Sequence, residues 1–518
     1  MCNGGAHISD LSDDLFLHIL SLLPTGRDLA RTSALSRRWR DLWRDLWMRG
    51  RVLRFDKVGC STADPDADVR YNDLVHDVLA RRANSGASVD TLKVSSWLWP
   101  GDARAQVWLH LAMELAVGSL AFHLRTPERE RMPGKTMDEL RPWLTLPCST
   151  SATSMSLELD NAFLLLPPTV EFHALTDLTL CTIRFTEVNG GRLSSLLSSS
   201  SCCPRLQKLT LKKLAWLPEL QLNGSALEIL HLEDLSVRGL LDVNASQLSA
   251  LHVDGYFMDC YTMPPNSVTI RAPALQTLDL SLNINYCQLE RQRHAIQLLQ
   301  ECSPIHRHVL SIHVPEKLKK SVAEDQLEEM PKLPSITNLT LKYYSKNSHS
   351  FEASVTTLLA RCSNLRHLRL DNFIHKNIDY ASKVTNCISR FELNGSPPKY
   401  GTPCDVGCST CDLRGSWKDN VISLDHLQEV EFSGFSGQEY CLDMVQLLFT
   451  SAPTLEKMLL TTHVSTDGCS HPPTIAMEPL ELRLPRGMGK WTAHPSANMT
   501  TLEWTPASST MLAGAVDA

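Results

Sequence analysis

The sequence predicts an α/β repeat protein, in which a small head of three helices precedes an irregular solenoid with a curved parallel sheet and helices on its convex side. Three observations support this prediction. A six-residue motif with apolar residues at its first, fourth and sixth positions returns along most of the chain. Hydrophobic residues make up 43% of the 518 residues, but aromatic residues only 6%. A short amino-terminal segment instead has helical spacing and residues that cap helices.

The head is expected over residues 8–48, which contain residues suited to begin and end three short helices. Ser12 is suited to cap the first helix, and Pro24 ends it. A second helix is expected over residues 28–35, and Ser36 is suited to cap a third. So short a segment cannot bury all of its leucine and tryptophan side chains in a core of its own, which favours a docking face for another protein.

The six-residue motif is typical of the strands of leucine-rich repeats. Its fourth and sixth residues point to one side of a strand, and its first turns inward from the preceding corner. Adjacent motifs such as those at Leu206 and Leu227 start 21 residues apart, within the usual repeat length of about 20 to 29. Clear copies start at Leu175, Leu206, Leu227, Leu248, Leu275, Ile336, Leu365, Ile388, Leu427 and Leu455, and weaker ones at Val89, Val117, Ala152 and Met499.

Leucine pairs between the strand motifs predict the helices of the convex side. LLSSSSCCPRL, LLARCSNL and LLFTSAPTL each join such a pair to a small residue and then to the next strand. The small residue is Cys203, Cys362 or Ala452. Because alanine takes the same place, we expect the two cysteines to be buried packing residues without a chemical role.

The domain organisation follows from these patterns. We expect disordered ends at residues 1–7 and 507–518, a linker with a solenoid cap at 49–88, repeats over 89–423 and two further repeats over 424–506. Insertions are expected near residues 283–334 and 395–420, where charged residues, Pro, Gly and Cys interrupt the period. We expect both to form projecting loops.

Two segments carry a family resemblance. The sequence RTSALSRRWRDLW, from Arg31 to Trp43, resembles the third helix of the plant F-box, although Ser12 stands where that family usually has a proline. LQEVEFSGFSG and SAPTLEKM, within residues 424–506, resemble the FBD segment found at the end of many plant F-box/leucine-rich-repeat proteins.

The F-box resemblance implies docking onto a Skp-type adaptor and, through it, onto a cullin. The positions that match the docking face of the family are Leu11, Leu15, Ile19, Leu20, Leu23, Leu35, Trp39, Leu42 and Trp43. Two other interpretations of the head stay open. One is a helical hairpin that caps the solenoid. The other is a basic helix that binds nucleic acid through Arg37, Arg38, Arg40 and Arg44, although no second basic element accompanies it.

The sequence predicts no catalytic residue, no metal and no cofactor. The best metal candidate combines Cys404, Cys408 and Cys411 with Cys441 or His426 as a fourth ligand. Zinc sites usually need two complete ligand pairs, and the second is missing, so we expect free thiols there. His306 and His308 likewise lack an acidic or cysteine partner at useful spacing. The chain also lacks the phosphate-binding, nucleophile-elbow and zinc-protease motifs.

Alternation along the strands predicts a concave face that mixes charges of both signs. Such a face suits a protein partner better than a polyanion, and the formal net charge of −7 also opposes binding to nucleic acid. A merely solvated sheet is compatible with the same residues. We expect a target protein, whose identity the sequence does not give, to contact Lys208, His231, His252, Asp279, Lys342, Arg369, Glu392 and Glu431.

The expected function is therefore the substrate-recognition subunit of a Skp–cullin–F-box ubiquitin ligase. We expect no membrane partner and a location in the cytoplasm, the nucleus or both, because neither a secretory signal nor a run of about 20 apolar residues is present. A leucine-rich-repeat scaffold outside any ligase is the alternative. A co-receptor for a small ligand would need a basic pocket, which the mixed face does not supply.

Overall fold

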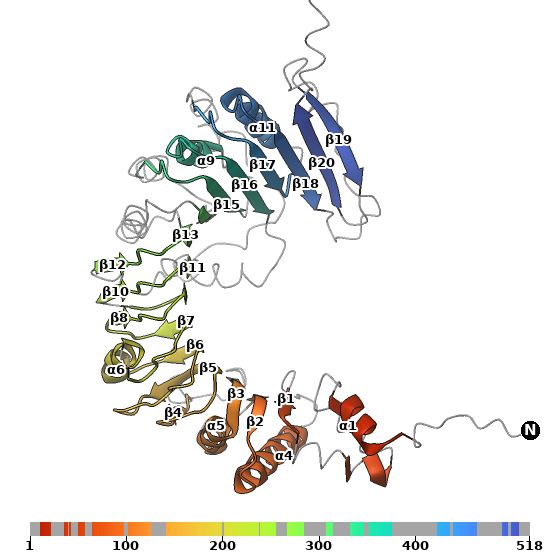
Figure 1. Cartoon of the computed structure of the whole chain (residues 1–518), viewed down its shortest axis with the longest axis vertical. Coiled ribbons are helices and arrows are strands. Elements are labelled where there is room, and N and C mark those ends of the chain that lie inside the picture. The colour runs from red at the N-terminus through yellow and green to blue at the C-terminus, as the bar shows by residue number, and fades with distance from the viewer. Residues whose placement is uncertain are drawn as a thin grey trace, which may run out of the picture. The chain divides into compact units, whose positions relative to one another are not determined.

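The computed structural model describes two compact units, each built on a sheet of mostly parallel strands with helices on one of its faces (Figure 1). The first unit comprises Met1–Leu248 and Pro265–Pro273, and the second Ser249–Pro264 and Ala274–Ala518. The predicted α/β repeat fold with a parallel sheet is confirmed. The described residues are 11–21, 36–39, 41–42, 50–56, 65–97, 102–125, 141–198, 201–237, 239–254, 267–283, 307–313, 332–345, 352–374, 422–435, 439–463, 489–495 and 499–506.

In the first unit, parallel strands follow one another in chain order. They are β1 (Val52–Phe55), β2 (Val89–Trp97), β3 (Ala116–Arg125), β5 (Ser154–Leu165), β6 (Asp177–Arg184), β7 (Lys208–Ala215) and β9 (Ile229–Glu233), with β4 (Trp143–Thr145) beside the end of β5. The crossovers that parallel pairing requires contain helices α4 (Pro65–Asn84), α5 (Arg104–Leu115) and α6 (Glu187–Ser198).

The leucine motif forms the core as predicted. In β7, Leu209 and Leu211 occupy the fourth and sixth motif positions and are at most 1% exposed. The first motif residue closes a short turn, because the N–H of Leu206 donates to the carbonyl of Cys203. The same turn joins Leu365 to Cys362 and Leu455 to Ala452, and all of these residues are buried. The predicted equivalence of Cys203, Cys362 and Ala452 is confirmed.

After β7, the first unit carries strands where helices were expected. β8 (Leu220–Asn223), β10 (Leu240–Asn244) and β12 (Ser267–Arg271) form a separate parallel sheet of three strands. For β8 and β10 the structure differs from the expectation because repeats of 21 residues leave too few residues for a helical crossover.

Helix α6 completes one edge of this small sheet with two serine side chains. Ser194 donates its hydroxyl to the carbonyl of Glu219 and accepts the N–H of Gln221, both at 3.1 Å. Ser198 donates to the carbonyl of Gln221 at 2.6 Å and accepts the N–H of Asn223 at 3.2 Å. Each hydroxyl both donates and accepts, so the helix satisfies the strand edge as a neighbouring strand would.

The second unit repeats the parallel arrangement and ends differently. Its strands β11 (Ala250–Asp254), β13 (Thr277–Asn283), β14 (Arg307–His313), β15 (Asn338–Ser345), β16 (His367–Ile374), β17 (Glu429–Ser433) and β18 (Lys457–His463) are parallel neighbours, accompanied by helices α9 (Glu352–Leu359) and α11 (Glu439–Ser451). β20 (Met499–Pro506) then pairs antiparallel with β18 and with β19 (Gly489–Pro495). The weak motif at Met499 is therefore a strand but not a parallel repeat.

One prediction about the insertions needs correction. Residues 307–313, inside the expected loop insertion 283–334, form the paired strand β14. The motif escaped notice because His308 stands at the register position that Leu278 and Leu339 hold in the neighbouring strands. Residues 49–88, expected to be linker and solenoid cap, contain β1, which pairs with β2, and helix α4. The ends at 1–7 and 507–518, the insertion 395–420 and the motif at Ile388 lie outside the described residues.

Gly190 and Gly191 of α6 offer a matched test of how closely this helix packs. A Cβ on Gly190 would lie 2.4 Å from Cδ of Pro218, whereas a Cβ on Gly191 would meet nothing within 4 Å. We expect Gly190→Ala to lower the free energy of unfolding by about 1–3 kcal/mol. Gly191→Ala should raise it by up to about 1 kcal/mol, because alanine favours a helix. Urea unfolding measures both, and equal effects of the two variants would contradict this packing.

Candidate protein-interaction surfaces

The described part of the head contains α1 (Asp13–Ser21) and helical residues at 37–39 and 41–42. The hydroxyl of Ser12 accepts the N–H of Leu15 at 3.4 Å, and that of Ser36 accepts the N–H of Trp39 at 3.3 Å. Both predicted helix caps are confirmed. The expected second helix, residues 28–35, lies outside the described residues.

An aromatic pair forms the interior of the head. The rings of Phe16 and Trp39 meet edge to face with centroids 4.6 Å apart, and Phe16 is only 1% exposed. Trp39 and Leu42 are each 8% exposed. Their burial favours a packing role for these two residues over direct contact with an adaptor. Phe16 was missed in the sequence, although its spacing of three from Ile19 marks it as an apolar helix position.

Arg38 joins the two described helical segments of the head. Its guanidinium donates to Asp13 at 2.7 and 2.9 Å and to the carbonyl of Leu11 at 2.6 Å, and it lies 4.6 Å above the centre of the Phe16 ring. One of the four arginines considered for nucleic acid is therefore used within the head.

The first helix still offers apolar surface. Leu15 is 47% exposed, and Leu11 and Ile19 are half-buried. Leu15 and Ile19 are four residues apart and so lie on one face of α1. These three are the described docking candidates that the structure leaves accessible. The side chain of Leu20 is not described, and Leu23, Leu35 and Trp43 lie outside the described residues.

In the second unit, predicted target-contacting residues form ionic clusters across strands. His252 and Asp279 are register partners, and Lys342 approaches the same carboxylate oxygen, at 3.5 and 3.8 Å respectively. Arg369 contacts Asp371 at 3.0 Å and Glu431 at 3.1 Å. The structure therefore brings together two groups of the predicted residues. Glu392 lies outside the described residues.

The first unit holds a similar cluster. Glu233 binds Lys212 at 2.8 Å and lies 3.6 Å from His231. Lys208 is exposed at the start of β7. Each of these clusters contains charged side chains of both signs. The arrangement therefore offers a partner fixed polar groups with little net charge, which suits a protein surface.

A backbone feature widens this face beyond what alternation predicts. Thr182, Lys213 and Asp234 have φ angles of 54°, 51° and 51°. Each follows directly on one of the register partners Cys181, Lys212 and Glu233. The left-handed residue is an extra one, so two successive half-exposed side chains appear on each strand before the buried pattern resumes. The sequence carries no glycine or asparagine at these positions to signal it.

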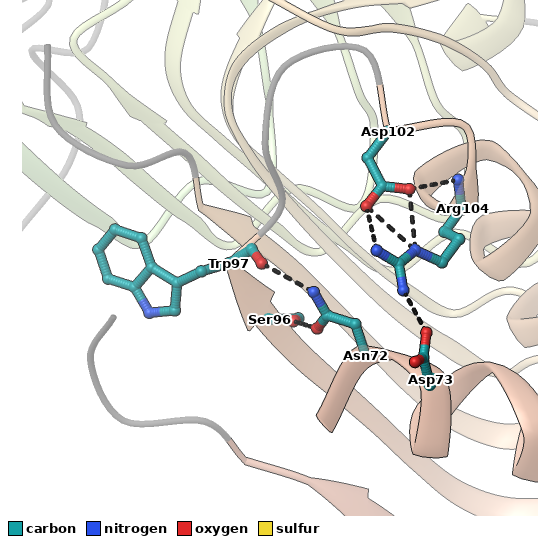
Figure 2. A network of polar contacts seen from close by, with 6 residues as sticks. All are labelled: Asn72, Asp73, Ser96, Trp97, Asp102 and Arg104. Carbon is teal, nitrogen blue, oxygen red and sulfur yellow. Dashed lines mark hydrogen bonds and ion pairs between the residues drawn. The ribbon is translucent and has the colours of Figure 1, made fainter. Parts of the chain in front are cut away.

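A polar network joins α4 to the end of β2 and to the start of α5 (Figure 2). Asn72 donates to the carbonyl of Trp97 at 3.2 Å and accepts the hydroxyl of Ser96 at 2.6 Å. Arg104 binds Asp102 through two nitrogens and Asp73 at 2.8 Å. The hydrogen bond to Asp102 is the main cause that raises the pKa of Arg104. These contacts use the network's polar groups within the fold, so it is a structural site.

Among the described cysteines, Cys203, Cys362 and Cys441 are buried, whereas Cys148 is exposed. Burial raises the pKa of the Cys203 and Cys362 thiols to about 12. Cys441, a possible metal ligand, is fully buried in α11, while His426 is exposed before β17. Cys404, Cys408, Cys411 and His306 lie outside the described residues, as does the side chain of His308. Within the described ranges, no group of three or more His, Cys, Asp or Glu residues could hold a metal ion.

Thiol labelling of the folded protein separates the two kinds of cysteine. We expect Cys362 to stay unmodified by a maleimide between pH 7 and pH 9, because its raised pKa keeps the thiolate scarce throughout that range. Cys148, which is exposed, should react under the same conditions. Peptide mapping by mass spectrometry reports each site. Fast labelling of Cys362 in folded protein would contradict its burial.

The two carboxylates that contact Arg369 provide a matched pair. The side chain of Asp371 is 9% exposed and that of Glu431 49% exposed. We expect Asp371→Asn to lower the free energy of unfolding by about 1–3 kcal/mol, because it weakens a buried charged hydrogen bond. Glu431→Gln should change it by less than about 0.5 kcal/mol, because water screens that pair. Urea unfolding distinguishes them, and the reverse order of effects would refute this assignment.

Comparison with known proteins finds two family models that match parts of the chain. The F-box domain model matches residues 8–49, and the model "FBD-associated F-box protein At5g56370, LRR repeats" matches residues 105–314. The chain is 29% identical over 214 residues to the F-box/LRR-repeat protein At4g14103 of Arabidopsis thaliana, covering 40% of this chain and 50% of the relative. It is 28% identical over 270 residues to the putative FBD-associated F-box protein At5g56400 of the same plant, and this match covers 49% of this chain and 52% of the relative.

The chain thus spans about half the length of the curated relatives it matches. The matches cover the head and the first part of the repeats, and residues 424–506 lie beyond both family models. Together with the parallel repeat sheets and the capped helices of the head, they show that the chain resembles F-box/leucine-rich-repeat proteins, including plant proteins of the FBD-associated kind.

Proposed function

We propose that the chain is the substrate-recognition subunit of a Skp–cullin–F-box ubiquitin ligase and acts in the cytoplasm, the nucleus or both. The observation that carries this proposal is the F-box match over residues 8–49, on which Leu15 is exposed. F-box domains generally bind Skp-type adaptors and, through them, cullins. Proteins of this family are typically non-catalytic, so the contribution of the chain is to hold a target near the ubiquitin-carrying enzyme.

In the head, some apolar residues pack in the interior and others stay exposed, and the exposed ones support adaptor binding. Phe16 and Trp39 hold the interior, and Arg38 fixes α1 against the other described helical segment. Leu15 and its neighbours Leu11 and Ile19 are the residues we propose to meet the adaptor. Apolar side chains that stay exposed together on a folded surface are typical of a site that binds another protein.

The strand faces of the two units are the proposed target-binding surfaces. The clusters around Asp279, Arg369 and Glu233 hold polar side chains in fixed positions before any partner arrives, which lowers the entropy lost on binding. Their balanced charge supports a protein target over nucleic acid. Among the described helices, none is long and apolar enough to cross a bilayer.

A surface substitution in α1 tests the adaptor contact without disturbing the interior. We expect Leu15→Asp to weaken binding to a plant Skp-type adaptor by about tenfold or more, because a leucine buried at an interface contributes roughly 1.5–3 kcal/mol. Binding is measured by calorimetry on the full chain, and circular dichroism confirms that the variant is folded. Val188→Asp is the control, because Val188 is 67% exposed but lies in α6.

Phe16→Ala shows what a core defect looks like, since it should lose adaptor binding together with the thermal stability of the head. Adaptor binding that survives Leu15→Asp unchanged would refute the proposed contact. Intact protein that does not bind the adaptor at all would refute the ligase proposal and favour a scaffold outside any ligase.

A further inference from the structure

The chain enters the repeat sheet directly after the F-box match ends at residue 49. The carbonyl of Gly50 accepts a hydrogen bond from Arg82 at 2.6 Å. The carbonyl of Arg51 accepts the N–H groups of Asp90 and Thr91 at 2.8 and 3.1 Å. Residues 52–55 pair with β2, and Asp56 binds Lys93 at 2.7 Å. Each of the described residues from 50 to 56 therefore contacts the first repeat, within the region that was expected to be linker and solenoid cap.

The contact at Arg51 has the same form as the contacts between later repeats. There too, one carbonyl accepts two successive N–H groups from the next repeat, as that of Thr176 does from Gln207 and Lys208. Arg51 thus belongs to the repeat ladder. Its side chain also binds Asp90 at 2.7 Å, but the Arg51 side chain is 79% exposed, so this ion pair contributes little.

Arg82 is the buried centre of this junction. The residue is 1% exposed, near the end of α4, and its guanidinium reaches backbone from two segments. Besides Gly50, it donates to the carbonyls of Ala87 at 3.1 Å and Ser88 at 3.2 Å, which lead into β2. Burying a guanidinium is costly unless its donors are used, so a side chain kept in this position indicates a specific geometric role.

We propose that Arg82 is a positioning residue, which locks the segment that leaves the F-box onto the first repeat so that head and repeats move as one body. The biological role of this junction rests on the proposed function, because a fixed junction would hold a bound target at a constant distance from the adaptor. The proposal predicts a rigid connection between the head and the repeats and not a flexible linker. Its physical basis is local and independent of which adaptor or target binds.

Arg82→Met tests the lock, and Arg81→Met is its matched control. Arg81 precedes it in the same helix, is exposed and contacts Asp77 at 3.6 Å. Dyes on unnatural residues at Arg37 in the head and Glu187 in α6 report their distance distribution by single-molecule energy transfer in the full chain. We expect a narrow distribution for the unsubstituted protein and for Arg81→Met, and a broad one for Arg82→Met.

Hydrogen exchange provides the second measurement. The amides of residues 52–55 should exchange about tenfold to a hundredfold faster in Arg82→Met, as the loss of a charged hydrogen bond implies, while those of β5 and β6 stay unchanged. A general loss of stability would instead accelerate all of them. Arg82→Met with the distance distribution and exchange rates of Arg81→Met would overturn the proposal.

If Arg82→Met does not fold, Arg82→Lys takes its place. Lysine keeps the charge, but its single nitrogen cannot replace both the Nε contact to Ala87 and the terminal contact to Gly50. We expect the same local loosening, and its absence would overturn the proposal. Adaptor affinity is measured in parallel and should not change in either variant. Failure of the unsubstituted protein to bind an adaptor would refute the ligase proposal alone, because the distance measurement needs no adaptor.

Discussion

The structure depends on a carbonyl shared between repeats. At the corner before a strand, one backbone carbonyl accepts two successive N–H groups from the following repeat, as in the contacts of Thr337 with Arg366 and His367. Directly before this contact, a buried leucine such as Leu365 closes the turn and anchors it in the core. The carbonyl at such a corner has its hydrogen-bond partners only when the next repeat is present. The repeats therefore stabilise one another, and none is expected to be stable alone.

This dependence explains which parts of the fold could be predicted from the sequence. A leucine at the fourth motif position is required by the core, so the strands that carry one were found at nearly their observed places. β14 was missed because His308 occupies that position. The backbone can pair as a strand whatever the side chain, whereas the leucine pattern requires an apolar residue there. The small sheet of β8, β10 and β12 was missed for another reason. Short apolar runs fit a strand or a helix turn equally well, and repeat length decides between them.

The strand faces show a second kind of limit. Alternation identified Asp279, Arg369 and Glu431 as outward residues, and the strand register places Asp279 beside His252 and Arg369 beside Glu431. Alternation failed at Thr182, Lys213 and Asp234, where a left-handed residue adds one outward side chain to each strand. A left-handed threonine or lysine costs energy and is kept only where the surroundings require it. The three left-handed residues follow directly on the register partners Cys181, Lys212 and Glu233, so neighbouring strands share the conformation and no single residue reveals it.

In the head, residues that match the family's docking face differ in whether they are exposed. Matching a family motif assigned Trp39, Leu42 and Leu15 to one docking face, because a motif records which residues recur and not which way they point. Packing divides them. Trp39 must be buried for its ring to meet Phe16 edge to face, and Arg38 can cover that ring only while Asp13 and the Leu11 carbonyl hold its guanidinium. Leu15 is then free to remain outside. The recurring tryptophan thus preserves the shape of the head, and the contact surface falls to the leucines that this shape leaves exposed.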